Sequence, residues 1–418
     1  MSHPAFKPSS KKERVFLTGV RRRGQTHHEF EASRSELNRL IDTAGGQVVA
    51  QASQEIEHPN PKSFLGKGKV QEIQNHIRQT SVDSVAIDDE LTPNQNHNLE
   101  DAWGVKVVDR TAVILDIFAK RAHTKEGRLQ VELAQLQYVQ SRLKGMWSHF
   151  SKQTGGIGTR GPGETQLEVD RRRIRERITL LRDRLKDVET HREIHRLRRE
   201  AVPFPLFSLV GYTNAGKSTL MNAVTKAGIF VEDKLFATLD PTVRRLKLPS
   251  GRQALLADTV GFIRKLPHTL IEAFKATFEE IAHSDCLIHV VDASDPEMHK
   301  QIETVERVLT ELNLGQKPVI VVFNKSDQGM MGFTGLQGIS VSALKGYGIE
   351  KLLEEMDTTA RRSCQKVRFC IPYSRGDILS TLYSMGHILE VKHEPHGVEV
   401  DCEINPKFVQ RYQEYLAE

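Results

Sequence analysis

Short runs of β-branched and apolar residues alternate with amphipathic stretches through the first 120 residues. Gly45-Gly46 ends the first amphipathic stretch and Thr92-Pro93 has the form of a helix start. Strands that alternate with helices favour a parallel sheet with helices on its faces, so we expect an α/β domain over 1–120. The predicted strands are Val15–Thr18, Gln47–Ala50, Ser84–Ile87 and Val105–Val108, and the clearest helices are Glu31–Thr43 and Val70–Arg78.

The pattern becomes purely helical from Leu129. One apolar stripe includes Leu129, Leu133, Leu136, Val139 and Leu143, and a second includes Ile174, Ile178, Leu181, Leu185 and Val188. Spacings of three and four residues are typical of a coiled-coil-like seam. The glycine-rich segment between the stripes, 155–163, should interrupt the helix. We expect an antiparallel helical hairpin over 121–202 with 155–163 at its tip.

Strands and helices alternate again over 203–362, after a proline-containing linker at Ala201–Pro205. This region should form a second α/β domain. The last part, 363–418, should form a small α+β domain with strands at Val367–Ile371, His387–Val391 and Val398–Cys402 and helices at Asp377–Met385 and Pro406–Tyr415. The whole chain is therefore expected to be a multidomain α/β protein.

Composition excludes some classes of protein and adds little else. The 418 residues are 38% hydrophobic and 27% charged, which is ordinary for a globular protein. No apolar stretch is long enough to span a bilayer, the N-terminus lacks a secretory signal, and the four cysteines have no ligand-like spacing. We expect a reduced, cytoplasmic protein without an integral membrane segment.

Charge is uneven, although the net value is only +5. Between Arg171 and Glu200, basic residues outnumber acidic ones about two to one, a bias that can mark nucleic-acid contact. The alternative is a solvated helix with alternating charges, and composition alone favours that simpler interpretation.

A phosphate-binding loop follows the buried strand Phe207–Val210 and precedes a helical stretch, Thr219–Lys226. Strand, glycine-rich loop and helix form the context that a Walker A motif requires. Backbone amides and the helix N-terminus bind phosphate oxygens, while the lysine contacts the β- and γ-phosphates and the serine binds magnesium. The loop residues are Gly211, Tyr212, Thr213, Asn214, Ala215, Gly216, Lys217 and Ser218.

Three further segments follow predicted strands and complete a nucleotide site. Asp258, Thr259, Val260 and Gly261 follow the strand Ala254–Ala257, so that the carboxylate can hold magnesium and the Gly261 amide can touch the γ-phosphate. In Asn324, Lys325, Ser326 and Asp327, the last carboxylate can accept two hydrogen bonds from guanine, which adenine cannot donate. Ser342, Ala343 and Leu344 supply an amide for guanine O6. The order of these segments predicts GTP and GDP as ligands, with Mg²⁺.

A switch segment should lie between the first two motifs. Its residues are Phe236, Ala237, Thr238, Leu239 and Asp240. One threonine hydroxyl there completes the magnesium shell, with Thr238 the first choice and Thr242 the second. The predicted metal ligands are thus Ser218 and Thr238, and the predicted catalytic residues are Lys217, Thr238 and Gly261.

The water-positioning group is missing from its usual place. Many GTPases have glutamine after the Asp-X-X-Gly motif, whereas this chain has Phe262, which predicts slow intrinsic hydrolysis. Asn214 could help to bind a K⁺ ion beside the phosphates, which would compensate for the missing glutamine. A simple turn cap is an equally good interpretation of Asn214.

The motifs at 64–69, 155–166, 211–218, 235–242 and 258–264 closely resemble those of the HflX family of translational GTPases over nearly the full chain. That resemblance implies the four domains above and favours Thr238 as the switch threonine. It also implies binding to the large ribosomal subunit and its rRNA, and the splitting or rescue of stalled ribosomes. The C-terminal region diverges most from the family.

The resemblance gives the basic hairpin more weight. Its tip carries Arg160 and few bulky side chains, which suits irregular RNA, so we expect the tip and Arg171–Arg173 to enter the large subunit. Two other interpretations stay open: an ATP-driven RNA-remodelling enzyme, and a GTP-gated ribosome-binding module with negligible turnover. We expect no DNA partner and a monomer, and we leave the turn at Gly66–Lys69 outside the GTP site.

Overall fold

The computed structural model describes residues 12–153, 162–200, 204–225, 234–267, 270, 274, 278, 281–329, 337–362 and 364–417. The chain divides into two compact units. The N-terminal unit contains Met1–Leu185 and Lys265–Ala273, and the C-terminal unit contains Lys186–Arg264 and Phe274–Glu418. The chain therefore passes between the units at three places: from Leu185 to Lys186, from Arg264 to Lys265 and from Ala273 to Phe274.

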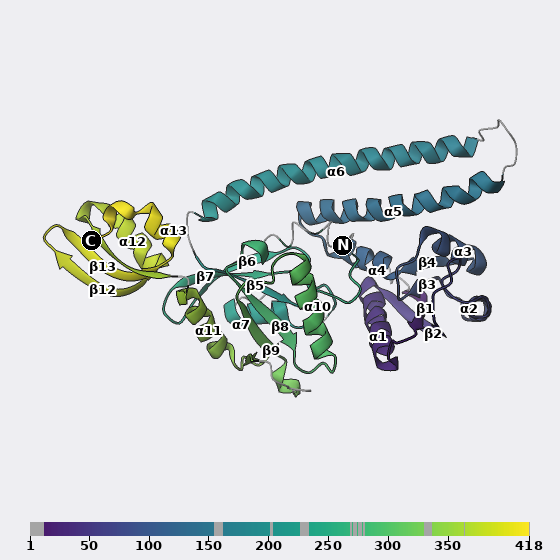
Figure 1. The fold of residues 1–418 in the computed structure, drawn as a ribbon, viewed down its shortest axis with the longest axis horizontal. Coiled ribbons are helices and arrows are strands. Elements are labelled where there is room, and N and C mark those ends of the chain that lie inside the picture. Colours follow the sequence, from purple (N-terminus) through teal and green to yellow (C-terminus); the bar gives the residue numbers. More distant parts are fainter. Residues whose placement is uncertain are drawn as a thin grey trace, which may run out of the picture. The chain divides into compact units, whose positions relative to one another are not determined.

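The N-terminal unit contains a four-stranded parallel sheet, as the alternation of strands and helices predicts (Figure 1). Its order is β2-β1-β3-β4, with β1 (Glu13–Arg22), β2 (Gly46–Ile56), β3 (Ser84–Ile87) and β4 (Lys106–Asp109). The first two strands are longer than predicted, because the prediction followed apolar runs and the outer ends of these strands are polar. Arg21 pairs there with Glu55, and Arg23 with Glu57, so ion pairs replace apolar contacts.

Helices cover both faces of this sheet. They are α1 (His27–Ala44), α2 (Lys67–Thr80), α3 (Pro93–Trp103) and α4 (Arg110–Arg121). Thr92 begins α3 with a capping box, and Gly45 ends α1 in a left-handed conformation at φ 93°, as the sequence predicts. Ile73 of α2 and Trp103 of α3 pack with Phe16 and Val85 in the core of one face. The opposite face packs against α1 and α4.

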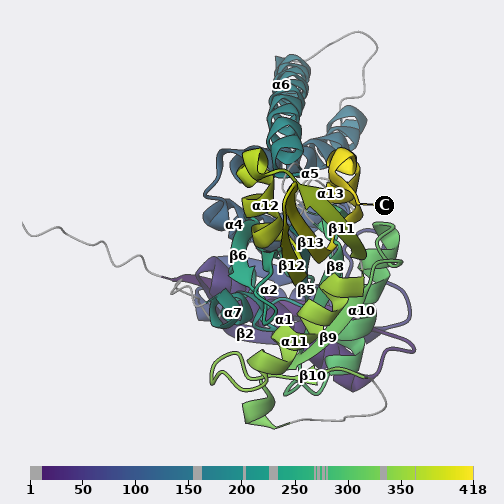
Figure 2. The ribbon, with the colours of Figure 1, turned by 90° about the vertical axis from the view of Figure 1, so that its left-hand side faces the viewer.

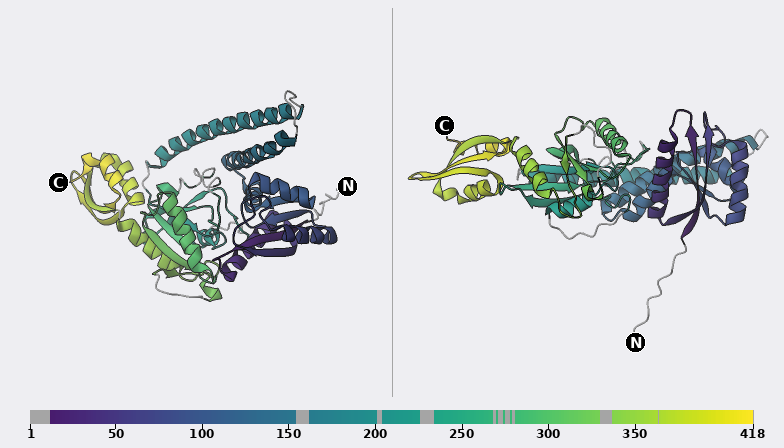
Figure 3. Two further views of the ribbon diagram at one scale, coloured as in Figure 1. Left: turned by 45° about the vertical axis from the view of Figure 1, so that its right-hand side comes forward. Right: turned by 90° about the horizontal axis from the view of Figure 1, so that it is seen from below.

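Two long helices follow, α5 (Lys125–Gln153) and α6 (Pro162–Glu200). Within the N-terminal unit they lie antiparallel, and Arg177 of α6 pairs with Glu132 of α5 at 2.6 Å (Figures 1 and 3). The predicted stripe is buried at Leu133 and Leu181, but Val139 is 42% exposed, so the seam does not extend along the whole stripe.

The predicted glycine-rich tip falls mostly on residues outside the described ranges. Within it, Pro162 and Gly163 begin α6 rather than belonging to a loop. Proline is favoured at the first position of a helix because the amide it lacks would be unsatisfied there in any case.

The C-terminal unit contains a six-stranded sheet in the order β10-β9-β8-β5-β7-β6. Only β6 is antiparallel to its neighbour. The helices α7 (Lys217–Thr225) and α11 (Ile349–Arg362) pack on one face, and α10 (Met298–Glu311) on the other. The strands are β5 (Leu206–Gly211), β6 (Thr242–Lys247), β7 (Gln253–Asp258), β8 (Cys286–Asp292), β9 (Val319–Asn324) and β10 (Ile339–Ser340).

The end of the chain forms a three-stranded antiparallel sheet with the order β11-β13-β12 (Figure 2). It comprises β11 (Gln365–Ile371), β12 (His387–Glu394) and β13 (Gly397–Ile404), with α12 (Gly376–Met385) and α13 (Pro406–Arg411). The last helix was predicted to reach Tyr415 but ends at Arg411. A short 3₁₀ turn at Gln413–Tyr415 replaces its last turn, and Leu416 then pairs with Phe369 of β11.

No helix among the described residues is both long enough and apolar enough to cross a lipid bilayer.

Candidate functional site

A cavity of about 360 Å³ lies in the C-terminal unit, where β5 runs into α7. In open α/β sheets ligands bind at the carboxyl ends of the strands, where the strand order reverses, and β5 lies at such a point between β7 and β8. The cavity is lined by Thr213, Asn214, Gly216, Lys217, Ser218, Thr219, Lys234, Phe236, Ala237, Thr238, Thr259, Gly261, Asn324, Lys325, Asp327, Gln328, Ala343 and Leu344.

The loop before α7 has the backbone of a phosphate cradle. Gly216 lies at φ 90°, and a Cβ atom added to it would lie 2.2 Å from the Asn324 side-chain nitrogen, so only glycine fits. Lys217 is buried, and its Nζ donates to the carbonyl oxygens of Gly211 at 3.1 Å and Tyr212 at 2.9 Å. Burial lowers the pKa of Lys217 to about 8, and nearby Asp258 opposes that shift.

Three oxygen-bearing side chains meet beside this lysine. The Ser218 hydroxyl donates to Asp258 Oδ2 at 2.6 Å and lies 2.7 Å from the Thr238 hydroxyl. Thr238 donates to the same carboxylate oxygen at 3.1 Å. The other oxygen, Asp258 Oδ1, is buried and has no partner among the described residues. Burial raises the pKa of Asp258, with the two hydroxyls opposing it.

The segment that carries Thr238 is anchored by its backbone. Phe236 lies at φ 53°, and its amide donates to the Thr213 hydroxyl at 2.8 Å. Phe236 and Leu239 are buried, which leaves Ala237, Thr238 and Asp240 partly exposed. Thr242 is exposed at the start of β6 and its hydroxyl contacts the sulfur of Met221 at 3.8 Å. The geometry therefore favours Thr238 over Thr242.

The far end of the cavity is built around Asn324. Its Nδ2 donates to the Ala215 carbonyl at 2.9 Å, and its Oδ1 accepts from the Ala343 amide at 3.0 Å. One buried side chain thus joins the phosphate loop to the loop after β10. Lys325 pairs with Asp292 at 2.7 Å, and the Ser326 amide donates to Val341 at 3.2 Å.

A carboxylate faces the same end. Asp327 Oδ1 accepts from the Ser342 hydroxyl at 2.6 Å, and this bond holds the pKa of Asp327 below its ordinary value. The carboxylate is therefore ionised and acceptor-only at neutral pH, as recognition of the two guanine donors requires. Leu344, beside it, is 77% exposed.

Residues 259–262 lie against the phosphate loop. Thr259 donates to the Leu209 carbonyl at 2.6 Å, and Val260 is buried. Phe262 is fully buried and stacks on Phe278, with ring centroids 5.7 Å apart. Its side chain belongs to the core and does not face the phosphates.

The backbone of Phe262 has a role that sequence reasoning missed. Its amide donates to the Gly211 carbonyl at 3.1 Å, and its carbonyl accepts from the Thr213 amide at 2.7 Å. This is a parallel bridge between the Asp-X-X-Gly segment and the phosphate loop. Backbone pairing of this kind is independent of side-chain identity, so no residue pattern could have predicted it.

Tyr212 was predicted as a loop residue and carries a further contact. Its hydroxyl accepts from the Arg264 amide at 2.8 Å, while the Arg264 guanidinium pairs with Glu297 at 2.5 Å. Lys234 and Gln328 line the cavity and were also missed, because neither lies within a recognised motif.

Comparison with known proteins decides the family. Family models match the chain at residues 31–119 (GTP-binding GTPase N-terminal), 121–199 (GTP-binding GTPase Middle Region) and 207–325 (50S ribosome-binding GTPase). The GTPase HflX of Caldanaerobacter subterraneus is 46% identical over 97% of this chain and 94% of its own length. This chain belongs to the HflX family. The HflX protein of Escherichia coli is 48% identical over 87% of each chain.

Membership makes this HflX-family protein a GTP-hydrolysing enzyme with a P-loop GTPase domain. Among solved structures, the complex of SsGBP with GDP matches 84% of this chain and 99% of its own, at 24% identity and a TM-score of 0.46.

Proposed function

We propose that this protein is a magnesium-dependent GTPase that binds the large ribosomal subunit and dissociates or rescues stalled ribosomes in the cytoplasm. The observation that carries the proposal is the match of residues 207–325 to a model described as 50S ribosome-binding GTPase, combined with HflX relatives over most of the chain. The four-domain division predicted above is part of this proposal.

The cavity and the predicted residues that line it support guanine-nucleotide binding. Lys217 would exchange its two backbone carbonyls for phosphate oxygens, because an ammonium gains more from an anionic oxygen than from a neutral one. Amides of the phosphate loop and of Gly261 would donate to phosphate oxygens as well. Asp327 would accept from the guanine N1–H and exocyclic amine.

The residues present also fit Mg²⁺. Ser218, Thr238 and Asp258 offer hard oxygen donors within 2.6–3.1 Å of one another, and one buried oxygen of Asp258 has no partner in the part of the chain that the structure describes. Ser218 and Thr238 would hold the ion directly and Asp258 through water. When bound, the ion would neutralise charge on the β- and γ-phosphates.

The site has no evident side chain among the described residues to position the attacking water molecule. The Phe262 side chain is buried against Phe278, so it cannot orient a water molecule. We expect slow turnover by the free protein and stimulation by ribosomes. Phosphate release over many turnovers, with and without ribosomes, separates this behaviour from that of a GTP-gated module with negligible turnover.

A bound K⁺ ion at Asn214 stays a prediction. Asn214 lines the cavity with its backbone at φ 63°, a conformation that asparagine tolerates better than most residues and that a simple turn would also explain. Equal hydrolysis rates in potassium and sodium salts would rule the ion out.

The helical hairpin is the proposed rRNA contact. Arg172 and Arg173 on α6 are more than 70% exposed, and each lies 3.8 Å from its acidic neighbour, too long for a strong ion pair. Guanidinium groups of this kind can exchange a weak carboxylate partner for phosphate.

Sedimentation with purified large subunits tests the proposal. We expect the protein to pellet with the subunits in the presence of a non-hydrolysable GTP analogue and to stay mostly in the supernatant with GDP. A variant without residues 155–163 should keep its GTP affinity and lose the pelleting. Subunit binding that is equal with both nucleotides, or unchanged by the deletion, would contradict the proposal.

A further inference from the structure

The phosphate loop and the segment after Gly261 are held together up to Arg264. Phe262 pairs with Gly211 and Thr213 through its backbone, and the Arg264 amide donates to the Tyr212 hydroxyl. Glu297, at the N-terminal boundary of α10, holds the Arg264 guanidinium. All of these contacts lie within the C-terminal unit. The 262–264 segment, which directly follows Gly261, is therefore tied to the phosphate loop by hydrogen bonds at both of its ends.

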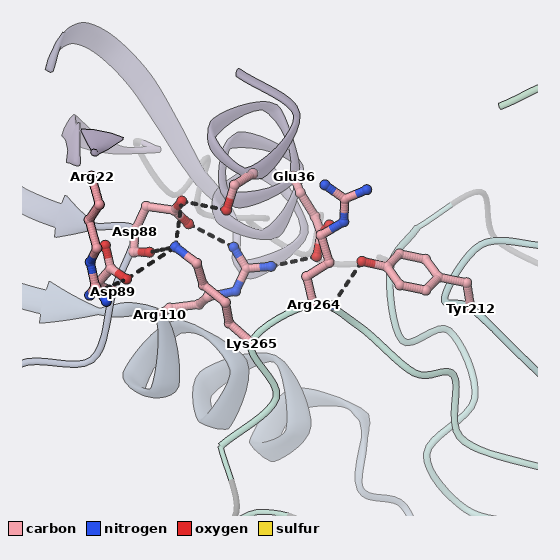
Figure 4. Close-up of polar contacts among 9 residues, drawn as sticks. Arg22, Glu36, Asp88, Asp89, Arg110, Tyr212, Arg264 and Lys265 are labelled. Atoms are coloured by element: carbon pink, nitrogen blue, oxygen red, sulfur yellow. Dashed lines mark hydrogen bonds and ion pairs between the residues drawn. The ribbon is translucent and has the colours of Figure 1, made fainter. Parts of the chain in front are cut away.

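The next residue, Lys265, belongs to the N-terminal unit and is bound there by all three hydrogens of its ammonium group (Figure 4). Its Nζ lies 2.6 Å from the Asp88 carbonyl oxygen, 3.3 Å from Asp88 Oδ2 and 3.1 Å from Asp89 Oδ1. The side chains of Asp88 and Asp89 are 2% and 13% exposed and that of Lys265 is 37% exposed, so the contact is partly shielded from water.

Lys265 balances the charge of a buried network. Asp88 also accepts from Arg110 at 2.7 Å and from the Ser33 hydroxyl at 2.5 Å, and Arg110 pairs in turn with Glu36 (Figure 4). Without the lysine, the carboxylates of this network would outnumber its cations, since Arg22, at 3.4 Å, is the one other cation paired with Asp89 among the described residues. Burial raises the pKa of Asp89, and Lys265 is the strongest opposing influence.

The place of this contact in the fold is informative. Asp88 and Asp89 directly follow β3, whose Ile87 is paired with Thr18 of β1. The order β2-β1-β3-β4 reverses between β1 and β3, so the two carboxylates lie where an open α/β sheet binds its ligand. Lys265 occupies that position with its own backbone at φ 52°, a conformation that costs a lysine energy and persists only where its contacts enforce it.

The γ-phosphate of GTP must meet the Gly261 amide and the Lys217 amine. These groups are already packed together: a Cβ atom on Gly261 would lie 2.8 Å from Lys217 Nζ and 2.7 Å from Thr213 Cα. A phosphate that enters beside the Gly261 amide would displace Lys217 Nζ, the 261–264 segment, or both.

We propose that Lys265 acts as an intramolecular ligand of the N-terminal sheet and that GTP, more than GDP, loosens its contacts with Asp88 and Asp89. The nucleotide state of the GTPase domain then reaches the N-terminal unit through the peptide bond between Arg264 and Lys265. The inference requires GTP binding and does not depend on the ribosome.

Hydrogen exchange of the full-length protein tests this, with peptides that cover residues 84–92. In the wild type, the β,γ-imido analogue of GTP should raise exchange in these peptides relative to GDP. In Lys265→Met the two nucleotides should give the same exchange, close to that of the wild type with the analogue. Asp89→Asn, which keeps the shape of the partner, should reduce the difference without abolishing it.

Lys120→Met is the matched control. Lys120 also binds one carboxylate, Asp116, and one backbone carbonyl, Ala44, within the N-terminal unit, but it lies outside the network. It should leave the nucleotide-dependent difference intact. Because linkage is reciprocal, Lys265→Met should also shift the ratio of analogue to GDP affinity about 5-fold towards the analogue.

A wild-type protein whose 84–92 peptides exchange equally with both nucleotides would overturn the proposal. So would a difference that persists in Lys265→Met, or one that Lys120→Met removes. The assay contains no ribosomes, so failure of the ribosome proposal leaves its outcome unaffected. Should Lys265→Met fold poorly, Lys265→Gln keeps an amide donor and should show at least half of the loss.

Discussion

The Ser342 hydroxyl donates to Asp327 Oδ1 across 2.6 Å, while Lys345 Nζ lies 3.9 Å from the other carboxylate oxygen, Oδ2. The bond also keeps Asp327 ionised at neutral pH. The base end of the cavity therefore presents an ionised acceptor to hydrogen-bond donors of the base. The preference for guanine over other bases can be tested directly at this residue.

Asp327→Asn should lower GTP affinity by about 10² to 10⁴-fold, because the NH₂ group of the asparagine amide would face the N–H donors of guanine instead of accepting from them. The same change should improve binding of xanthosine triphosphate, whose ring carbonyl can accept from that amide. Calorimetry with both nucleotides measures this. Ser342→Ala is the control, since it removes the supporting hydroxyl and keeps the carboxylate, and it should weaken GTP binding less. Unchanged GTP affinity in Asp327→Asn would contradict the assignment.

Thr238→Val and Thr242→Val form a matched pair of nearly isosteric changes in one segment. Only Thr238 lies beside Ser218 and Asp258, so only its loss should reduce the ribosome-stimulated hydrolysis rate, by about 10-fold or more. Steady-state phosphate release checks both variants. Equal effects of the two substitutions would show that the switch threonine has been misplaced.

Ser218→Ala should remove the dependence of GTP binding on magnesium. In the wild type, chelation of the metal should weaken GTP binding by about 10- to 100-fold, as expected for loss of charge-assisted contacts. The variant should bind weakly both with and without the metal. A variant that still responds fully to chelation would place the ion elsewhere.

His289 of β8 should make the protein less stable in mild acid. It is 4% exposed, and burial, with a smaller effect of Lys217, lowers its pKa to about 4. The unfolded chain, with a histidine pKa near 6.5, then binds the proton first as the pH falls. Stability from this group is complete above about pH 6.5 and decreases by roughly 1.4 kcal/mol per unit between pH 6.5 and about 4.

Thermal unfolding at pH 7.5 and pH 5 measures this for the wild type and His289→Leu. The loss of stability between the two pH values should be smaller in the variant. His299→Leu, at an exposed position on α10, is the control substitution. Identical pH responses of the wild type and His289→Leu would contradict the prediction.

Sequence patterns predicted most of what lies near the nucleotide. The phosphate loop follows a buried strand, Asp258 and Asn324 each end one, and parallel strands bring such positions together at one edge. The helix caps at Thr92 and Gly45 were equally predictable from the sequence, because a cap depends on neighbouring residues only.

The contacts missed were those that join distant segments. The pairing of Phe262 with Gly211 uses backbone atoms alone, and the bond from Arg264 to Tyr212 links positions 52 residues apart. The stripe through Val139 was misleading because helical periodicity shows which face is apolar, not what covers it. The end of the last helix depended on the pairing of Leu416 with Phe369.

Asn324 touches Ala215 with one end of its amide and Ala343 with the other. Ligand fragments should reveal this bridge. Tripolyphosphate at the phosphate loop would order the loop after β10 through Asn324, and guanosine at the base end would order the phosphate loop in the same way. The two fragments should then bind together more tightly than their separate affinities imply. A compound that occupies only the base end could for that reason strengthen phosphate binding rather than compete with it.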